Sequence, residues 1–167
     1  MNTVKIRSYN AKRAEMFGKK LSSVDKIILL RSEPHTHTEL QFSDQYANIS
    51  FSATMADGAK CARFKQISYS HAERWDTVDI EVTSAEEHLM WDEANRIKGT
   101  PYDLVGLLST ISKHNIIKPS EKAVWCTETV NMLVCMLPQW KSFLDALDMP
   151  MELIPCEMDM LARHFFK

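Results

Sequence analysis

Hydrophobic residues alternate with polar ones along the first half of the chain. Residues 37–42 (HTELQF) place Leu40 and Phe42 on one face, and residues 47–54 follow after a polar turn. A two-residue period of this kind is typical of half-buried strands, so we predict a β-hairpin here. The pattern also predicts strands at residues 26–32, 60–67 and 76–82, with turns at 43–46 and 56–58.

Helical periodicity is clearest at residues 83–99. We expect Ser84 to cap this helix, Glu87 to complete a capping box, and Gly99 to end it. Further helices are predicted at residues 101–114, 125–137 and 140–147, and a strand-like segment followed by a turn or helix is predicted after residue 150. Strands and helices come in blocks rather than as alternating βαβ units, so the predicted fold class is α+β.

No repeat, low-complexity tract or flexible linker divides the 167 residues. A chain of this length buries a substantial core, and we expect residues 1–167 to form a single domain. Within it, residues 1–24 are expected to form an N-terminal arm or helix. Residues 138–167 are expected to form a C-terminal extension.

The charge balance is slightly acidic, with 20 Lys and Arg, 22 Asp and Glu, and a net charge of -2. This leaves no basic excess to neutralise phosphates, so nucleic acid is not expected as a partner. No glycine-rich phosphate-binding motif occurs, and we expect no cofactor. The N-terminus has no apolar signal-peptide core, and four cysteines without a CxxC spacing favour free thiols, which predicts a cytoplasmic protein.

Two cysteines, Cys126 and Cys135, lie on the predicted helix 125–137. Nine residues turn an α-helix by about half a circle, so the two thiols point to opposite faces. Cys126 lies at the helix start, where unpaired N–H groups and the helix dipole lower a thiol pKa. Cys135 has apolar neighbours and is expected in the core. Cys126 is therefore a candidate nucleophile, with a buried structural thiol as the alternative.

A nucleophilic cysteine needs a base, and His37 begins a strand whose other face is apolar. If the hairpin pairs Phe42 with Ala47, His37 lies opposite Ser52. Ser52 is then a candidate for orienting the imidazole in a triad-like arrangement. Other candidates for this role are Ser50, Gln41 and Glu39. The alternative interpretation is a polar strand start without a catalytic role.

Zinc binding is a further possibility for the histidines of this strand. His35 and His37 are two residues apart, which would place both on one face. No HExxH or CxxC motif supplies the remaining ligands, and we expect no metal site.

Four motifs follow one another in an informative order: HTEL (37–40), DG (57–58), GTPYD (99–103) and WCTETV (125–130). Together they resemble the circularly permuted branch of the NlpC-like, papain-type cysteine peptidases and amidases, in which the histidine strand precedes the nucleophile helix. The resemblance covers roughly residues 25–137. It implies a papain-like, circularly permuted fold with a small antiparallel sheet packed on the helix that carries the nucleophile.

Carried over residue by residue, the resemblance implies that Cys126 is the nucleophile and His37 the general base. Tyr102 matches the tyrosine whose hydroxyl, in similar enzymes, lies near the nucleophile and helps to stabilise the oxyanion. Some relatives carry an acid on the strand that follows the histidine strand. Here that strand reads NISFSAT, with serine in place of the acid.

The resemblance implies a cysteine hydrolase that acts on a peptide or amide, with cell-wall peptides as substrates in many relatives. The absence of a signal peptide is consistent with action in the cytoplasm. It is also consistent with a phage-type protein that is released by lysis or carried in a virion. One alternative is an acyltransferase or thioesterase acting on lipid-like substrates, as in the lecithin retinol acyltransferase group. That alternative needs membrane contact, for which the basic residues beside Met16 and Phe17 are candidates, although a solvated arm is also consistent. A catalytically inactive binding module on the same fold is the third hypothesis.

Overall fold

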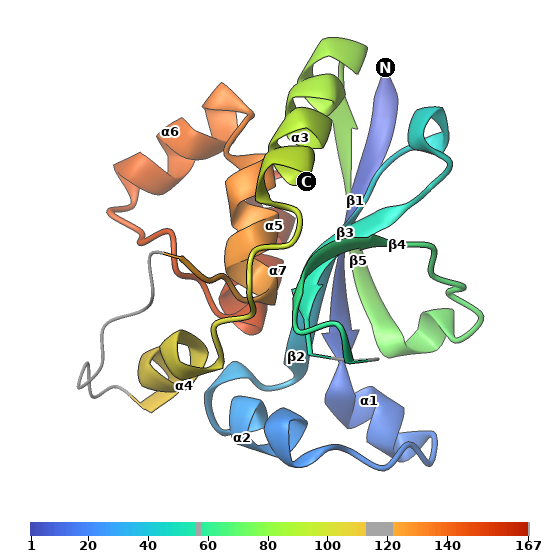
Figure 1. The fold of residues 1–167 in the computed structure, drawn as a ribbon, viewed down its shortest axis with the longest axis vertical. Helices are drawn as coiled ribbons and strands as arrows, with labels where there is room; N and C mark the ends of the chain where they lie inside the picture. Colours follow the sequence, from blue (N-terminus) through green and yellow to red (C-terminus); the bar gives the residue numbers. More distant parts are fainter. Residues whose placement is uncertain (56–57, 113–121, 167) are drawn as a thin grey trace.

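An antiparallel sheet with helices packed on one face forms the centre of the computed structural model (Figure 1), which describes residues 1–55, 58–112 and 122–166. The strands are β1 (Asn2–Asn10), β2 (His35–Gln41), β3 (Ser50–Thr54), β4 (Cys61–Lys65) and β5 (Trp75–Val82), in the order β4-β3-β2-β1-β5. The helices are α1 (Ala11–Met16), α2 (Ser23–Ser32), α3 (Ser84–Ile97), α4 (Leu104–Ser112), α5 (Cys126–Val134), α6 (Pro138–Ala146) and α7 (Pro155–Phe165), with 3-10 turns at Asp44–Tyr46 and Ala72–Arg74. The predicted α+β class is confirmed.

The N-terminal residues form β1 in the interior of the sheet, which corrects the predicted arm or helix for residues 2–10, whereas residues 11–16 of the same range do form a helix, α1. Val4 and Ile6 are fully buried, whereas Lys5 and Arg7 between and after them are partly exposed. Ile6 pairs with residues of both β2 and β5. The alternation of one buried and one exposed side chain is the period of a strand with one core-facing side.

Residues 26–32 lie in helix α2, which corrects the predicted strand. Ser22 caps the helix, since its Oγ accepts a hydrogen bond from the Asp25 N–H at 3.1 Å and the Asp25 carboxylate accepts from the Ser22 N–H at 3.0 Å. Ile28 is buried, whereas Leu30 is 81% exposed. The segment is therefore a surface helix despite its apolar composition, because a capping box stabilises its start and only one of its faces is buried.

The β2–β3 hairpin forms as predicted, but its register differs by two residues. Leu40 pairs with Phe51, and the Phe42 N–H donates to the Ile49 carbonyl at 2.9 Å, not to a partner at Ala47. Ala47 and the residue after it have positive φ angles of 56° and 52°, which extend the turn. A two-residue shift keeps every side chain on its predicted face but changes which residues lie opposite one another.

Helices α3, α5 and α7 cover one face of the sheet (Figure 1). Helix α5 contacts β2 and β3, and α7 contacts β1, β2 and β5. Met158 of α7 and Trp140 of α6 are fully buried, and the Trp140 Nε1–H donates to Asn131 Oδ1 at 2.9 Å. Residues 138–166 therefore contribute to the central core rather than forming a peripheral extension.

Two helix starts differ slightly from the prediction. Thr83, not Ser84, caps α3, and its partner is Glu86. Helix α4 begins at Leu104 instead of Pro101, and the Asp103 carboxylate accepts from the N–H of the third helical residue at 2.7 Å. The predicted end of this helix at 113–114 and the turn residues 56–57 lie outside the described residues. No helix in the described ranges is both long and apolar enough to cross a membrane.

Candidate active site

Cys126 is the first residue of helix α5. Trp125 before it is extended, and the Glu128 carboxylate accepts from the Trp125 N–H at 3.4 Å, which fixes the helix start. Because the first N–H groups of a helix have no partner within it, they surround the thiol with positive partial charge. The Cys126 residue is fully buried.

Tyr102 reaches the site because its backbone is held between β4 and the segment that leads into α5. The Tyr102 N–H donates to the Lys60 carbonyl at 2.9 Å, and the Val124 N–H donates to the Pro101 carbonyl at 2.9 Å. Val124 is two residues before Cys126, so this bridge brings the Tyr102 hydroxyl to the thiol. Burial, and then the charge and hydrogen bond of Cys126, raise the pKa of Tyr102, which keeps the phenol a hydrogen-bond donor.

His37 lies on β2 and contacts both the thiol and a carboxylate. Its Nε2 lies 3.1 Å from Glu39 Oε1, and its side chain also forms a hydrogen bond with Cys126. Burial lowers the pKa of His37, but the hydrogen bonds and negative charges of Cys126 and Glu39 outweigh burial and raise that pKa. The imidazole therefore holds its proton over a wider pH range than a free histidine.

Two cysteines of the same helix have opposite pKa shifts. For Cys126, burial raises the thiol pKa, but the hydrogen bond and charge of His37 and a hydrogen bond from the Thr38 backbone lower it below its usual value overall. For Cys135, at the other end of α5, burial raises the pKa to about 11. Cys126 and His37 therefore favour a thiolate–imidazolium ion pair, whereas Cys135 stays a thiol.

The structure brings Cys126, His37 and Tyr102 together and places Ser52 in another role. The Ser52 hydroxyl donates to the Thr38 carbonyl at 2.6 Å. The carboxylate that contacts the imidazole is Glu39, two residues after His37 on the same strand. The two-residue shift of the hairpin register explains why the predicted pairing of Ser52 with His37 is wrong.

Tyr69, in the connection between β4 and β5, also supports the site and was not among the predicted residues. Its hydroxyl donates to Glu39 Oε2 at 2.9 Å and lies 2.5 Å from Ser50 Oγ. The Arg7 guanidinium lies 3.9 Å from the centre of the Tyr69 ring. The contact with Tyr69 holds the Glu39 carboxylate in place, and Glu39 in turn orients the His37 imidazole. No local sequence pattern marks Tyr69, because its role depends on how a connection folds over the sheet.

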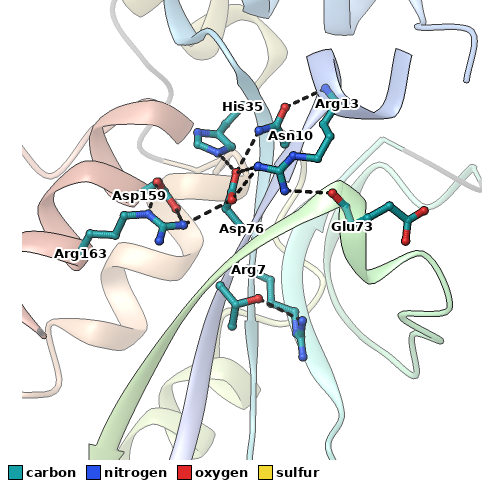
Figure 2. Close-up of polar contacts among 9 residues, drawn as sticks. Arg7, Asn10, Arg13, His35, Glu73, Asp76, Asp159 and Arg163 are labelled. Carbon is teal, nitrogen blue, oxygen red and sulfur yellow. Dashed lines mark hydrogen bonds and ion pairs between the residues drawn. The ribbon is translucent and has the colours of Figure 1, made fainter. Parts of the chain in front are cut away.

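His35 and His37 serve different sites, although the spacing predicted one shared face. Asn10 of β1 pairs with His35 and Tyr9 pairs with His37, so the residue between the histidines is an extra one, a β-bulge. His35 Nε2 lies 2.8 Å from Asp76 Oδ2 and is buried (Figure 2). The described residues hold no group of three or more His, Cys, Asp or Glu side chains arranged for a metal ion.

Asp76 is the centre of a charged cluster that joins the sheet to two helices (Figure 2). It accepts from Asn10 Nδ2 at 3.0 Å and from Arg13 Nη2 at 3.0 Å, and Arg163 of α7 lies 3.6 Å away. Burial raises the pKa of Asp76, but the hydrogen bonds from Asn10, His35 and Arg13 and the charge of Arg13 lower it to about 2 overall. This cluster is a structural ion-pair network.

A cavity of about 680 Å³ opens over the site. His37 and Tyr102 line it, together with residues of the α1–α2 connection and the polar face of the sheet. Cys126 is fully buried and is not itself a lining residue; it belongs to a small apolar cluster with Ile28, Leu107 and Trp125. A substrate in the cavity would therefore meet His37 and Tyr102 directly.

Comparison of the chain with protein-family models, with curated proteins and with solved structures found no match. The papain-type family therefore remains a prediction that rests on the motifs in the sequence.

Proposed function

We propose that the protein is a cysteine hydrolase that transfers an acyl group from a peptide or amide to Cys126 and then to water. The observation that carries this proposal is the pairing of the Cys126 thiol with the His37 imidazole at a helix N-terminus. A lowered thiol pKa next to an imidazole is the arrangement that activates a cysteine nucleophile.

In the proposed acylation step, the Cys126 thiolate attacks the carbonyl carbon, and the carbonyl π electrons move to oxygen. The Cys126 backbone N–H and the Tyr102 hydroxyl would donate hydrogen bonds to this oxyanion. The oxyanion collapses, the C–N bond breaks, and the His37 imidazolium gives its proton to the departing amine. The products are a thioester on Cys126 and a neutral His37.

In deacylation, neutral His37 takes a proton from water while the water oxygen attacks the thioester carbonyl. The C–S bond breaks, the acid leaves, and the thiolate–imidazolium pair is restored. Glu39, held by Tyr69, would keep the imidazole oriented through both steps. One positioned carboxylate behind a histidine base is the arrangement of a catalytic triad.

The chain order also supports a papain-like, circularly permuted fold as part of the proposal. The histidine strand β2 precedes the nucleophile helix α5, and α5 packs on the sheet next to β2 and β3. The motifs HTEL and WCTETV fall on these two elements.

An acyltransferase or thioesterase acting on lipid-like substrates is the second candidate. Met16 and Phe17, at the end of α1, are 85% and 56% exposed. They are followed by Lys19 and Lys20, which line the cavity. Exposed apolar side chains beside basic ones are typical of membrane-surface contact.

An acyl-enzyme experiment tests the first proposal. The protein is mixed with 4-nitrophenyl acetate, nitrophenolate release is followed, and mass spectrometry locates any acetyl group. We expect a burst and an acetyl thioester on Cys126, both absent in Cys126→Ser and unchanged in Cys135→Ser, the matched thiol control. Acetylation of Cys126 no faster than that of Cys135 would contradict the proposal and would favour an inactive binding module.

A further inference from the structure

We infer that the cavity selects an acyl donor that carries a carboxylate close to the scissile bond. This inference rests on the proposed hydrolase function and names a substrate class for it. It comes from the charges that line the cavity, which differ in sign from the chain as a whole.

Four cationic side chains line the cavity: Lys19, Lys20, Arg63 and Lys65. The chain has a net charge of -2, so this concentration of positive charge is local. Two carboxylates share the lining, so the cations outnumber them four to two, and a concave site with an excess of one sign of charge attracts ligands of the opposite sign. The volume of about 680 Å³ lies in the range of small-ligand and peptide side-chain sites.

Two carboxylates also line the cavity, and both are engaged by protein groups. Asp25 accepts from the Ser22 N–H at 3.0 Å and from the Ser22 hydroxyl at 2.7 Å. Glu39 contacts His37 at 3.1 Å and accepts from Tyr69 at 2.9 Å. Both carboxylates thus already have hydrogen-bonding partners within the protein, and the cations of the lining outnumber them.

The cations come from two separate parts of the chain. On the sheet, Arg63 and Lys65 of β4 pair with Ser52 and Ser50 of β3 and line the same cavity as these serines. Lys19 and Lys20 of the α1–α2 connection line that cavity as well, together with His37.

Lys19 and Lys20 are exposed, and neither makes an ion pair with the described residues. A carboxylate bound inside a cavity of this size would lie within about one Debye length, about 8 Å at physiological salt, of the residues that line it. Both groups of cations would therefore attract it.

Two alkylating reagents of nearly equal size test this inference. Iodoacetamide is neutral and iodoacetate is anionic, and with either reagent the Cys126 thiolate displaces iodide to form an S–CH₂ bond. The ratio of the iodoacetate rate to the iodoacetamide rate at Cys126 measures the preference of the cavity for an anion. His37 is unchanged in all variants, so its contribution cancels in the comparison.

One unit charge at about 8 Å in a water-like medium changes the rate of a singly charged reagent about twofold. We therefore expect the rate ratio to fall about fourfold in Lys19→Gln/Lys20→Gln and again about fourfold in Arg63→Gln/Lys65→Gln. The matched control is Lys98→Gln/Lys141→Gln, which removes two charges outside the cavity and should leave the ratio unchanged. Raising the salt concentration should lower the ratio in the wild-type protein and have less effect in the variants.

A rate ratio that is insensitive to both cavity double variants would overturn the inference. So would retention of the wild-type protein, but not of Lys19→Gln/Lys20→Gln, on phosphatidylglycerol vesicles, because these lysines would then serve a membrane. Failure of the proposed function looks different: neither reagent would then react with Cys126 faster than with Cys135. Fast iodoacetamide labelling with an unaffected ratio would contradict only the substrate class.

Discussion

The two histidines of β2 are two residues apart, and each contacts a carboxylate, yet their surroundings give them different roles. His35 is 5% exposed and contacts Asp76 within a network of arginines that ties β1, β5 and α7 together. His37 has a side chain that is 23% exposed, lines a cavity, and contacts a thiol as well as Glu39. A histidine–carboxylate contact is therefore not in itself a catalytic feature.

The bulge at residue 36 separates the two sites. It adds one residue to β2 opposite β1, so His35 joins the Asp76 cluster while His37 joins the cavity. Bulges are enriched next to active sites because they redirect a side chain without ending the strand. The comparison predicts that changes around His35 affect stability and that changes around His37 affect chemistry.

The largest expected effect is on chemistry. His37→Asn should lower the steady-state hydrolysis of 4-nitrophenyl acetate about 10²–10⁴-fold, because the general acid and base are lost. The free energy of unfolding, measured in urea, should change by less than about 1 kcal/mol, since the side chain is partly exposed. A variant with wild-type turnover would show that His37 is another structural histidine.

The next effect is on stability. Asp76→Ala should lower the free energy of unfolding by about 2–3 kcal/mol, because Arg13 and His35 lose their shared partner. The matched control is Asp79→Ala on the same strand, whose ion pair with Lys5 is exposed and should contribute less than about 1 kcal/mol. Equal losses in the two variants would show that the Asp76 cluster is an ordinary surface feature.

A smaller effect is expected from the carboxylate behind His37. Glu39→Gln keeps a hydrogen-bonding group but removes the charge that raises the pKa of His37. We expect a smaller loss of hydrolysis than in His37→Asn, because the imidazole itself remains, and the basic limb of the pH–rate profile should move to lower pH. Glu81→Gln on β5, exposed and outside the cavity, is the control. An unmoved basic limb would exclude Glu39 as the group that sets this pKa.

The smallest effect is the acid dependence of the Asp76 cluster. The pKa of Asp76 is about 2 in the folded protein, below its usual 3.8. A lowered folded-state pKa stabilises the protein above the unfolded-state pKa, and this contribution is lost as the pH falls through the folded-state value. The difference in unfolding free energy between wild type and Asp76→Asn should thus be constant above pH ~5 and shrink toward pH ~2. The full shift would correspond to about 2 kcal/mol, and we expect about 1 kcal/mol because solvent screens this partly exposed cluster. A difference independent of pH would contradict the assigned ion pairs.

Local pattern was sufficient to predict several parts of the fold. The hairpin, β4, β5, α3 and α5 follow from alternation, helical spacing and capping residues. The same kind of pattern is present in β1, where Val4 and Ile6 alternate with Lys5 and Arg7, but no strand was predicted there. Helix α2 was mistaken for a strand because an apolar run at residues 27–30 outweighed the Ser22–Asp25 capping box.

The residues of the candidate site that depend on a single helix or strand could be predicted from the sequence. Those whose role depends on how several elements pack together could not. Cys126 at a helix start and His37 on a polar strand face were found from local sequence. The predicted role of Ser52 was wrong because it assumed a hairpin register two residues away from the observed one, and local sequence did not rank Glu39 above the other candidates. The role of Tyr69 could not be predicted from local sequence, because only the path of the β4–β5 connection brings its hydroxyl to Glu39.

The central claim is that Cys126 and His37 form a thiolate–imidazolium pair. The most direct test is the pH dependence of iodoacetamide alkylation at Cys126, located by mass spectrometry, in the wild-type protein and in His37→Ala, with Cys135 as the internal reference. We expect an apparent pKa for Cys126 below the ~8.5 of a free thiol, a rise toward or above that value without His37, and labelling of Cys135 only at high pH. A Cys126 profile like that of an ordinary thiol, unchanged in His37→Ala, would contradict the claim.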